Sequence, residues 1–417
     1  MRPLLYLICI LTDFAAFIVI FAVSRGLAEQ QVPHWYLGVV GAGLSFTAGI
    51  ASLSGGWLAH RFDGRKVFVT GAGLLVASIL GCMAGPASRL YVPAYLLLGV
   101  GLGLIYPPMI GWLNRGDDVH ANRRRVSQTL ILFCVAWNFG MMCGQLTAGS
   151  LFSLGPHWTF GAALVIATVN VIIATAVAGT VSSHAPTGDA APPPPPREAA
   201  LATGFKRLSW IANLGGTFGG SLIVHLLPGL AVAIGIAPDD HGRLLGSWRA
   251  AVIATYLLLH FAGFWHFRFR FSVASQLLGV VGLLITASAT SETTLFAGLV
   301  LLGQLVGFNY FSGLYYSTLG SSNENRSFAA GIHEATLATG MALGTIVGGT
   351  LGTVINQRAP YLFAAAVLTL LIGMQGVAWW RWIRPLRQDV SVPAPGAGAT
   401  SHAPVASVPV MSESEIV

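Results

Sequence analysis

The chain has 417 residues, of which 54% are hydrophobic and only 9% are charged. A soluble domain carries about a quarter charged residues, so this composition excludes an ordinary water-soluble protein. The net charge of +7 would favour a nucleic-acid partner in a soluble protein. Here the basic residues follow a membrane topology instead, and we expect no nucleic-acid partner.

Apolar runs of roughly 20 residues recur along the chain, and each can cross a ~30 Å hydrocarbon core as a helix. They lack the two-residue alternation of barrel strands, so they predict transmembrane helices. The first run holds Asp13 and lacks a cleavage site, which indicates an uncleaved span rather than a signal peptide. The twelve predicted spans lie near residues 3–24, 35–58, 67–86, 91–113, 127–152, 157–180, 206–234, 244–266, 272–290, 294–318, 328–355 and 360–382.

Topology follows from the distribution of Lys and Arg. With the N-terminus inside, five of the 22 basic residues fall outside, which leaves seventeen on the cytoplasmic side. This asymmetry agrees with the positive-inside rule and predicts that both termini are cytoplasmic. The five outside residues are Arg25, Arg89, Arg243, Arg249 and Arg358.

A proline-rich segment separates the sixth span from the seventh. It contains five consecutive prolines at residues 192–196, and such a sequence serves as an extended spacer. We therefore expect an N-terminal six-helix half (residues 1–180), a cytoplasmic linker (181–204) and a C-terminal six-helix half (205–388). The tail, residues 389–417, is rich in Ala, Pro, Ser and Val, and we expect it to be disordered.

Two glycine patterns recur in the two halves at offsets of 204 and 200 residues. Parallel six-helix repeats of this kind place a substrate path between the halves. The matched sets are Gly99, Gly103 and Tyr106 with Gly303, Gly307 and Tyr310, and Gly140, Gly144 and Gly149 with Gly340, Gly344 and Gly349.

Small residues spaced by four form a ladder on one face of spans five and eleven. The ladders are Gly140, Gly144 and Ala148, and Gly340, Gly344 and Gly348. Such faces let a neighbouring backbone approach closely. Static helix packing is one interpretation, and a sliding contact between the two halves is the other.

Residues 144–149 read Gly-Gln-Leu-Thr-Ala-Gly and resemble the Gly-Pro-x-x-Gly-Gly motif of helix five in antiporters of the major facilitator superfamily. Gln145 stands where the motif has proline, and Ala148 replaces its first late glycine. Residues 344–349 of span eleven echo the motif and depart from it only at Thr345.

The loop between spans two and three resembles the signature loop of the same superfamily, Gly-x-x-x-Asp-Arg-x-Gly-Arg-Arg/Lys. His60 replaces the usual aspartate, and Asp63 is an additional acidic residue that could take over its role. The residues of this chain that fit the motif, or stand in for it, are Gly56, Arg61, Asp63, Gly64 and Arg65.

The resemblance implies an all-α membrane protein with twelve transmembrane helices in two pseudo-symmetric six-helix halves. It also implies transport of a small molecule by alternating access. Proton-coupled drug antiporters of the superfamily usually carry an arginine in helix four, ahead of its glycines. Residues 96–106 contain none, so the proton-antiport mechanism of those members does not transfer directly.

Ionisable groups inside the membrane are costly and usually mark function. Asp13 and Glu334 are the two acids that the spans place well inside the membrane. Arg249 is expected near the outer end of span eight, where it either snorkels to the headgroups or binds a ligand. The residues proposed for the substrate or proton pathway are Asp13, Glu334, Arg249, Tyr6, Tyr106, Asn138, Asn213, Tyr256, His260, Asn309, Tyr310 and Tyr316.

These features predict a secondary active transporter, an efflux or metabolite carrier working by antiport with protons. Transport of organic anions such as monocarboxylates through Arg249 is the alternative, and a membrane channel or receptor is the alternative from another class. Catalytic clusters and a Walker loop are absent from the sequence, so we expect neither an enzyme nor direct use of ATP. The four cysteines lack metal-ligand spacing, and we expect no metal or cofactor.

The expected partners are a small-molecule substrate, protons and the lipid bilayer, and the protein is expected to be a monomer. Arginine outnumbers lysine by twenty to two, and alanine and glycine are abundant. This usage favours a GC-rich bacterium and therefore an inner-membrane location.

Overall fold

The computed structural model describes residues 2–113, 123–180, 196–320 and 326–388. The predicted tail and most of the predicted linker, including its first four prolines, lie outside these ranges. The elements in the described ranges are α1 (Arg2–Glu29), α2 (His34–Phe62), α3 (Gly64–Cys82), α4 (Tyr91–Leu113), α5 (Arg123–Leu154), α6 (Pro156–Thr180), α7 (Pro196–His225), α8 (Leu227–Ala233), α9 (Pro238–Phe261), the 3₁₀ helix η1 (Gly263–Trp265), α10 (Phe269–Ser288), α11 (Glu292–Leu319), α12 (Arg326–Val354), α13 (Ala359–Trp382) and α14 (Arg384–Gln388).

In the described part of the chain, eleven helices are long and apolar enough to cross a membrane. The number rises to twelve when α7 and α8 are counted as one span, bent by 44°. Helices satisfy every backbone donor and acceptor within one segment, which is what a hydrocarbon environment requires. The predicted all-α membrane fold is confirmed.

The seventh span differs from the straight segment 206–234 that the apolar run predicts. Helix α7 begins at Pro196 and ends at His225, and α8 continues after the bend as Leu227–Ala233. Pro228 has no backbone N–H and cannot donate to the carbonyl group of Val224, so the helical hydrogen bonds are interrupted there. At the start of α7, Pro196 occupies a first-turn position that needs no such donor.

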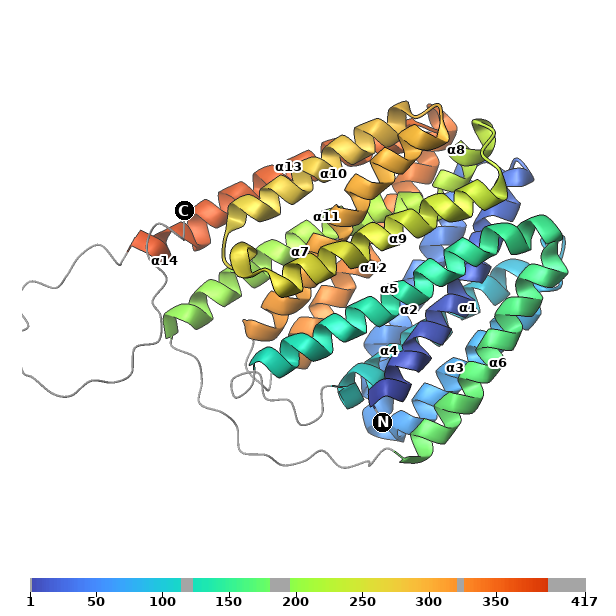
Figure 1. The fold of residues 1–417 in the computed structure, drawn as a ribbon, viewed down its shortest axis with the longest axis horizontal. Coiled ribbons are helices and arrows are strands. Elements are labelled where there is room, and N and C mark those ends of the chain that lie inside the picture. The colour runs from blue at the N-terminus through green and yellow to red at the C-terminus, as the bar shows by residue number, and fades with distance from the viewer. Residues whose placement is uncertain (1, 114–122, 181–195, 321–325, 389–417) are drawn as a thin grey trace, which may run out of the picture.

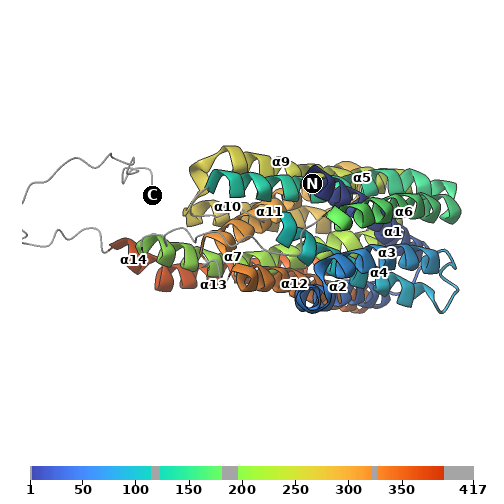
Figure 2. The same cartoon turned by 90° about the horizontal axis from the view of Figure 1, so that it is seen from below.

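The helices form two groups along the chain, α1–α6 and α7–α14 (Figures 1 and 2). The main contacts between the groups join α2 to α12 and α5 to α9. These two contacts correspond to each other under the sequence repeat, because α9 repeats α2 and α12 repeats α5. We call the end of the bundle that carries Arg2 and Asp63 the proximal end, and the end that carries Glu29 and Pro238 the distal end.

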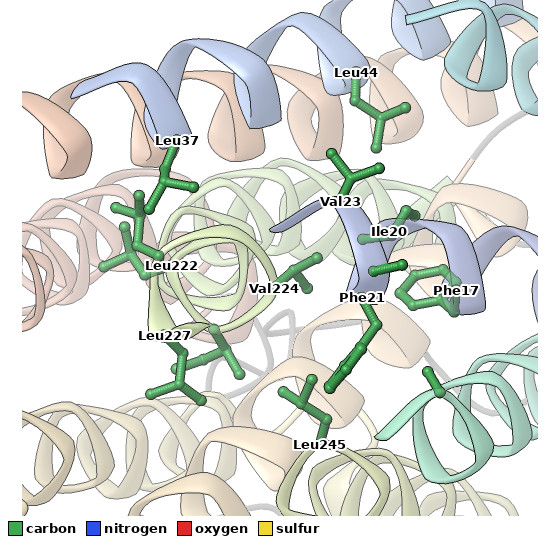
Figure 3. Packing of buried hydrophobic residues seen from close by; sticks show 14 of the residues in the cluster. Phe17, Ile20, Phe21, Val23, Leu37, Leu44, Leu222, Val224, Leu227 and Leu245 are labelled. Atoms are coloured by element: carbon green, nitrogen blue, oxygen red, sulfur yellow. The ribbon is translucent and has the colours of Figure 1, made fainter. Parts of the chain in front are cut away.

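Apolar side chains from both halves fill the distal part of the interface. Phe17, Phe21 and Val23 of α1 lie in one buried cluster with Leu227 of α8 and Leu245 of α9. Figure 3 shows these side chains, with others from α2 and α7, between the helices of the two halves. Close packing of these side chains stabilises the closed contact between the halves at the distal end.

Two crossings in this contact bring helix backbones together at glycine. A Cβ atom added to Gly38 of α2 would lie 3.0 Å from the Cα of Gly349 in α12. A Cβ atom added to Gly242 of α9 would lie 3.2 Å from the Cα of Gly149 in α5. The late glycines of the two repeated motifs therefore lie at the two matching contacts between the halves.

Candidate functional site

Polar side chains from six helices of both halves lie near one another in the middle of the bundle. Asp13 and Asn138 come from the N-terminal half and are 1% exposed, whereas Arg249 comes from the C-terminal half and is 6% exposed. An apolar chain buries such groups only where they find partners. We therefore treat this group as the candidate site, and its members are Asp13, Tyr106, Trp137, Asn138, Arg249, Tyr256, Tyr310 and Glu334.

Each half contributes a carboxyl group that accepts a hydrogen bond from a tyrosine. The Tyr106 hydroxyl of α4 donates to Asp13 Oδ2 of α1. The Tyr310 hydroxyl of α11 donates to Glu334 Oε1 of α12 over 3.5 Å. The two tyrosines are the repeat-related pair of the sequence, but their acids lie on helices that the repeat does not relate.

Hydrogen bonds between α5 and α9 connect the two halves at Asn138. Arg249 Nη1 donates to Asn138 Oδ1 over 3.2 Å, and Asn138 Nδ2 donates to the Tyr256 hydroxyl over 3.2 Å. Arg249 is the twelfth residue of the 24-residue helix α9. The expectation that it lies near the outer end of the span is therefore wrong, because α9 begins six residues before the predicted span.

Aromatic rings fill the space between the two tyrosine–carboxyl pairs. The Trp137 ring lies 5.0 Å from the Tyr310 ring across the interface and 6.5 Å from the Tyr106 ring in its own half. The Tyr256 ring lies 6.3 Å from the Tyr310 ring. Trp137 escaped the sequence reasoning, although a tryptophan in the middle of a span, away from the interfacial belts, is itself unusual.

Other candidate residues lie outside this cluster. Asn213 donates to Thr336 Oγ1 over 3.2 Å, and Asn309 donates to the Ala212 carbonyl oxygen over 2.8 Å, so both join helices within the C-terminal half. The Tyr316 hydroxyl accepts the Phe267 N–H over 2.7 Å near the proximal end.

Two candidates from the polar faces of spans one and eight are only partly buried. Tyr6 lies on α1 seven residues before Asp13, toward the proximal end. His260 lies in the last turn of α9, next to Phe261, whose side chain is 81% exposed. Neither has the buried setting of Asp13 or Arg249.

The glycine ladders pack mainly within their own halves. A Cβ added to Gly144 would lie 2.9 Å from the Phe17 Cβ of α1, and Gly140 likewise faces Ile10 of α1. Gly340 and Gly344 face α7 in the same way, and Gly348 lies against α7 and α13. The ladder glycines are therefore intra-half packing surfaces, whereas Gly149 and Gly349, each one residue beyond its ladder, contact the other half.

The signature loop forms a tight turn between α2 and α3 at the proximal end. Asp63 has φ +77°, and its Oδ1 accepts the Arg65 N–H over 3.0 Å as the N-cap of α3. Its carboxylate also pairs with Arg65 Nε at 3.2 Å. The backbone hydrogen bond from Arg65 lowers the pKa of Asp63 below its usual value. Asp63 therefore supplies an acidic cap; the side chain of His60 lies outside the described residues.

The other motif residues lie in the helices on either side of the turn, Gly56 and Arg61 in α2 and Gly64 in α3. Arg61 is exposed, and its guanidinium lies over the Trp57 ring at 5.5 Å. Gly64 is the first residue of α3. A groove of about 570 Å³ lies at the same end of the bundle, between α7 and α13–α14, well away from the polar cluster.

His333 is fully buried, and its ring lies 5.2 Å from the Tyr310 ring. The His333 side chain therefore packs between α12 and α11 inside the C-terminal half. Among the described residues, no three His, Cys, Asp or Glu side chains are grouped to hold a metal ion.

The sequence is similar to proteins of one known family. The model of the family described as Major Facilitator Superfamily matches residues 5–252. An uncharacterised MFS-type transporter of Mycobacterium tuberculosis is 25% identical over 136 residues, which span 32% of this chain and 23% of that relative.

Two solved structures share the fold at low identity. A bacterial homologue of the human lysosomal transporter Spinster, in an inward-facing and occupied conformation, has a TM-score of 0.69 at 11% identity and covers 92% of this chain and 97% of its own. The human organic anion transporter MFSD10 (TETRAN) has a TM-score of 0.62 at 16% identity, with 90% and 98% covered.

Proposed function

Because this chain belongs to the major facilitator superfamily, we propose that it moves a small molecule across the membrane by alternating access to the central polar cluster. It is a secondary transporter, and its two halves would rock about the site that they share. The observation that carries the proposal is the hydrogen-bonded bridge from Arg249 through Asn138 to Tyr256. That bridge joins the halves at the centre of the bundle.

We further propose that protons drive the cycle through Asp13 and Glu334. Neither acid pairs with a cation among the described ion pairs, which are Arg25–Glu29, Arg65–Asp63 and Arg243–Asp240. A tyrosine hydroxyl can donate to an ionised carboxylate and accept from a protonated one. Each tyrosine–carboxyl pair can therefore hold or release a proton without losing its hydrogen bond.

Transport in proteoliposomes with an imposed pH gradient tests the coupling. Asp13→Asn should abolish gradient-driven accumulation but leave substrate exchange measurable, since a neutral isostere preserves the site and cannot cycle a proton. Glu292→Gln is the matched control, because Glu292 is exposed at the start of α11. Wild-type transport that ignores the gradient would show that these acids serve structure or substrate binding.

We propose the direction and setting of transport from the sequence alone. The motif at residues 144–149 supports efflux by antiport, and the basic residues support cytoplasmic termini in a bacterial inner membrane. Residues 1–180 and 205–388 would act as the two moving halves of a monomer. The predicted cytoplasmic linker, 181–204, would join them, with its residues 196–204 forming the start of α7.

Transport of organic anions is a second candidate function, supported by the position of Arg249. A cation this far inside the bundle is costly unless it meets a negative charge. MFSD10, which shares the fold, is an organic anion transporter by its description. Under this candidate, Arg249 holds the anionic group of the substrate and the two acids couple its movement to protons.

A further inference from the structure

The guanidinium group of Arg249 lies against two aromatic rings. It lies 4.0 Å over the Trp248 ring and 5.1 Å over the Phe17 ring. Aromatic faces stabilise a cation and leave its N–H donors pointing outward in the guanidinium plane. Because all five donors of a guanidinium lie in its plane, hydrogen-bond acceptors meet Arg249 at its planar edge.

Within the described residues, the planar edge of the Arg249 guanidinium has fewer acceptors than donors, and its one protein acceptor is uncharged. Nη1 donates to the Asn138 amide oxygen, while Nε is buried with no hydrogen-bond partner. The ion pairs among the described residues do not include Arg249. A guanidinium group carries five donors and matches a carboxylate bidentately, so a carboxylate satisfies this edge better than one amide does.

Asn138 is held in place by contacts on both sides of its amide group. Nδ2 donates to the Tyr256 hydroxyl over 3.2 Å and to the Cys134 carbonyl oxygen of its own helix over 3.2 Å. The side chain is 1% exposed. Its oxygen is thereby directed at Arg249 across the boundary between the halves.

We infer that the Asn138 amide oxygen occupies the position at Arg249 that a substrate carboxylate takes, so that a monocarboxylate displaces Asn138 and breaks this bond between the halves. This inference rests on the organic-anion form of the proposed function. Asn138 is then a positioning and specificity residue, a neutral competitor built into the site. The guanidinium–amide bond joins a cation to a neutral acceptor, whereas an ionised carboxylate adds an opposite charge and accepts two parallel N–H bonds, so the carboxylate displaces Asn138 only when it is ionised.

The surroundings define the substrate further. One buried guanidinium balances one negative charge, which favours a carboxylate over a phosphate dianion. Arg249 lies over the Phe17 ring, and the rings of Trp137 and Tyr310 belong to the same cluster. These three rings favour a substrate with an apolar or aromatic body. Displacement of Asn138 removes its bonds to Arg249 and Tyr256, two hydrogen bonds between α5 and α9, and so couples binding to movement of the halves.

Equilibrium binding to the purified full-length protein tests the inference without requiring transport. The probes are monocarboxylates from acetate to 3-phenylpropionate, each compared with its amide, and the readout is tryptophan fluorescence, because Trp248 stacks on the guanidinium. At least one carboxylate should bind, and its amide should bind at least tenfold more weakly. Asn138→Ala should tighten carboxylate binding about tenfold by removing the competitor.

Three further variants separate competition from structural damage. Asn138→Asp supplies a permanent carboxylate to Arg249 and should abolish binding, as should Arg249→Gln. Tyr256→Phe loosens Asn138 and should give a smaller gain in affinity than Asn138→Ala. Gln375→Ala is the control: this buried amide bonds to Gln276 and to the Leu371 carbonyl oxygen within its own half, so its loss should lower the melting temperature and leave the affinity unchanged.

Several results would overturn the inference. Unchanged or weaker carboxylate binding in Asn138→Ala that melts like the wild type would show that Asn138 is no competitor. Equal binding of acids and amides, or no binding of any carboxylate, would remove the substrate class. If the protein then still transports other compounds along a proton gradient, the proposed transport function stands and only this inference fails. If carboxylates bind but nothing is transported, the transport function is refuted and the carboxylate site at Arg249 remains.

Discussion

Methyl groups added at the two distal glycine crossings should shift the halves toward a distally open arrangement. A Cβ on Gly149 would lie 2.9 Å from the Asp239 Cα, and a Cβ on Gly349 would lie 2.9 Å from the Gly38 Cα. Ordinary carbon contacts are about 3.5–4.0 Å, so each helix pair must separate by roughly 1 Å. Backbone atoms cannot rotate aside as side chains can, and the strain therefore falls on the contact between the halves.

Overpacking of a close contact costs about 1–3 kcal/mol. The cost applies only while the distal end is closed, because the two backbones part when it opens. Each replacement should then shift the closed-to-open equilibrium by about 5- to 150-fold. Gly149→Ala and Gly349→Ala combined should act nearly additively, since their crossings join different helix pairs.

The distance between spin labels at Ala87→Cys and Thr290→Cys, after replacement of the native cysteines, reports the opening. Both positions are exposed at the distal end, one in each half. The population at longer distance should grow in Gly149→Ala and Gly349→Ala. Gly161→Ala adds the same methyl group with no atom within 4 Å and should leave the distances unchanged. Lower melting temperatures with unchanged distances would refute the reasoning, because the crossings would then be static packing.

Topology and the acidic cap offer two simpler tests. Reporter fusions after Gly64, Thr203 and Gln388 should all report the cytoplasm, and an outside signal at Thr203 would contradict the twelve-span arrangement. Asp63→Ala removes the cap of α3 and should lower stability by about 1 kcal/mol, while Asp63→Asn keeps an acceptor that tolerates the positive φ. Because the pKa of Asp63 is lowered in the folded protein, the carboxylate stabilises it above the ordinary carboxyl range. The difference in melting temperature between wild type and Asp63→Ala should therefore shrink as the pH falls through that lowered pKa.

The glycine spacing predicts which residues share a helix face, but it does not predict which neighbouring helix packs against that face. A spacing of four residues places Gly140 and Gly144 on one face of α5, and the sequence alone establishes that. It does not say which helix meets the face, because several neighbours could. The structure assigns this face to α1 and reserves Gly149 for the other half.

In the candidate site, too, the sequence predicted single residues but not their partners on other helices. Asp13 and Glu334 were predictable because a charge inside a twenty-residue apolar run is visible from composition alone. Their tyrosine partners lie 93 and 24 residues away, and the period of one helix cannot predict a partner on another. Trp137 resembles any apolar residue of its span until Tyr310 is packed against it.

The sequence by itself determined the class of fold, the number of spans and the duplication of the halves. These follow from bilayer thickness and from the need to pair every backbone group, and both act locally along the chain. Tertiary structure alone decided the bend before α8, the depth of Arg249 and the hydrogen bonds that join the halves at Asn138. Those features depend on how helices rotate and slide against one another, because in a bilayer close packing and hydrogen bonds between helices, rather than hydrophobicity, select their arrangement.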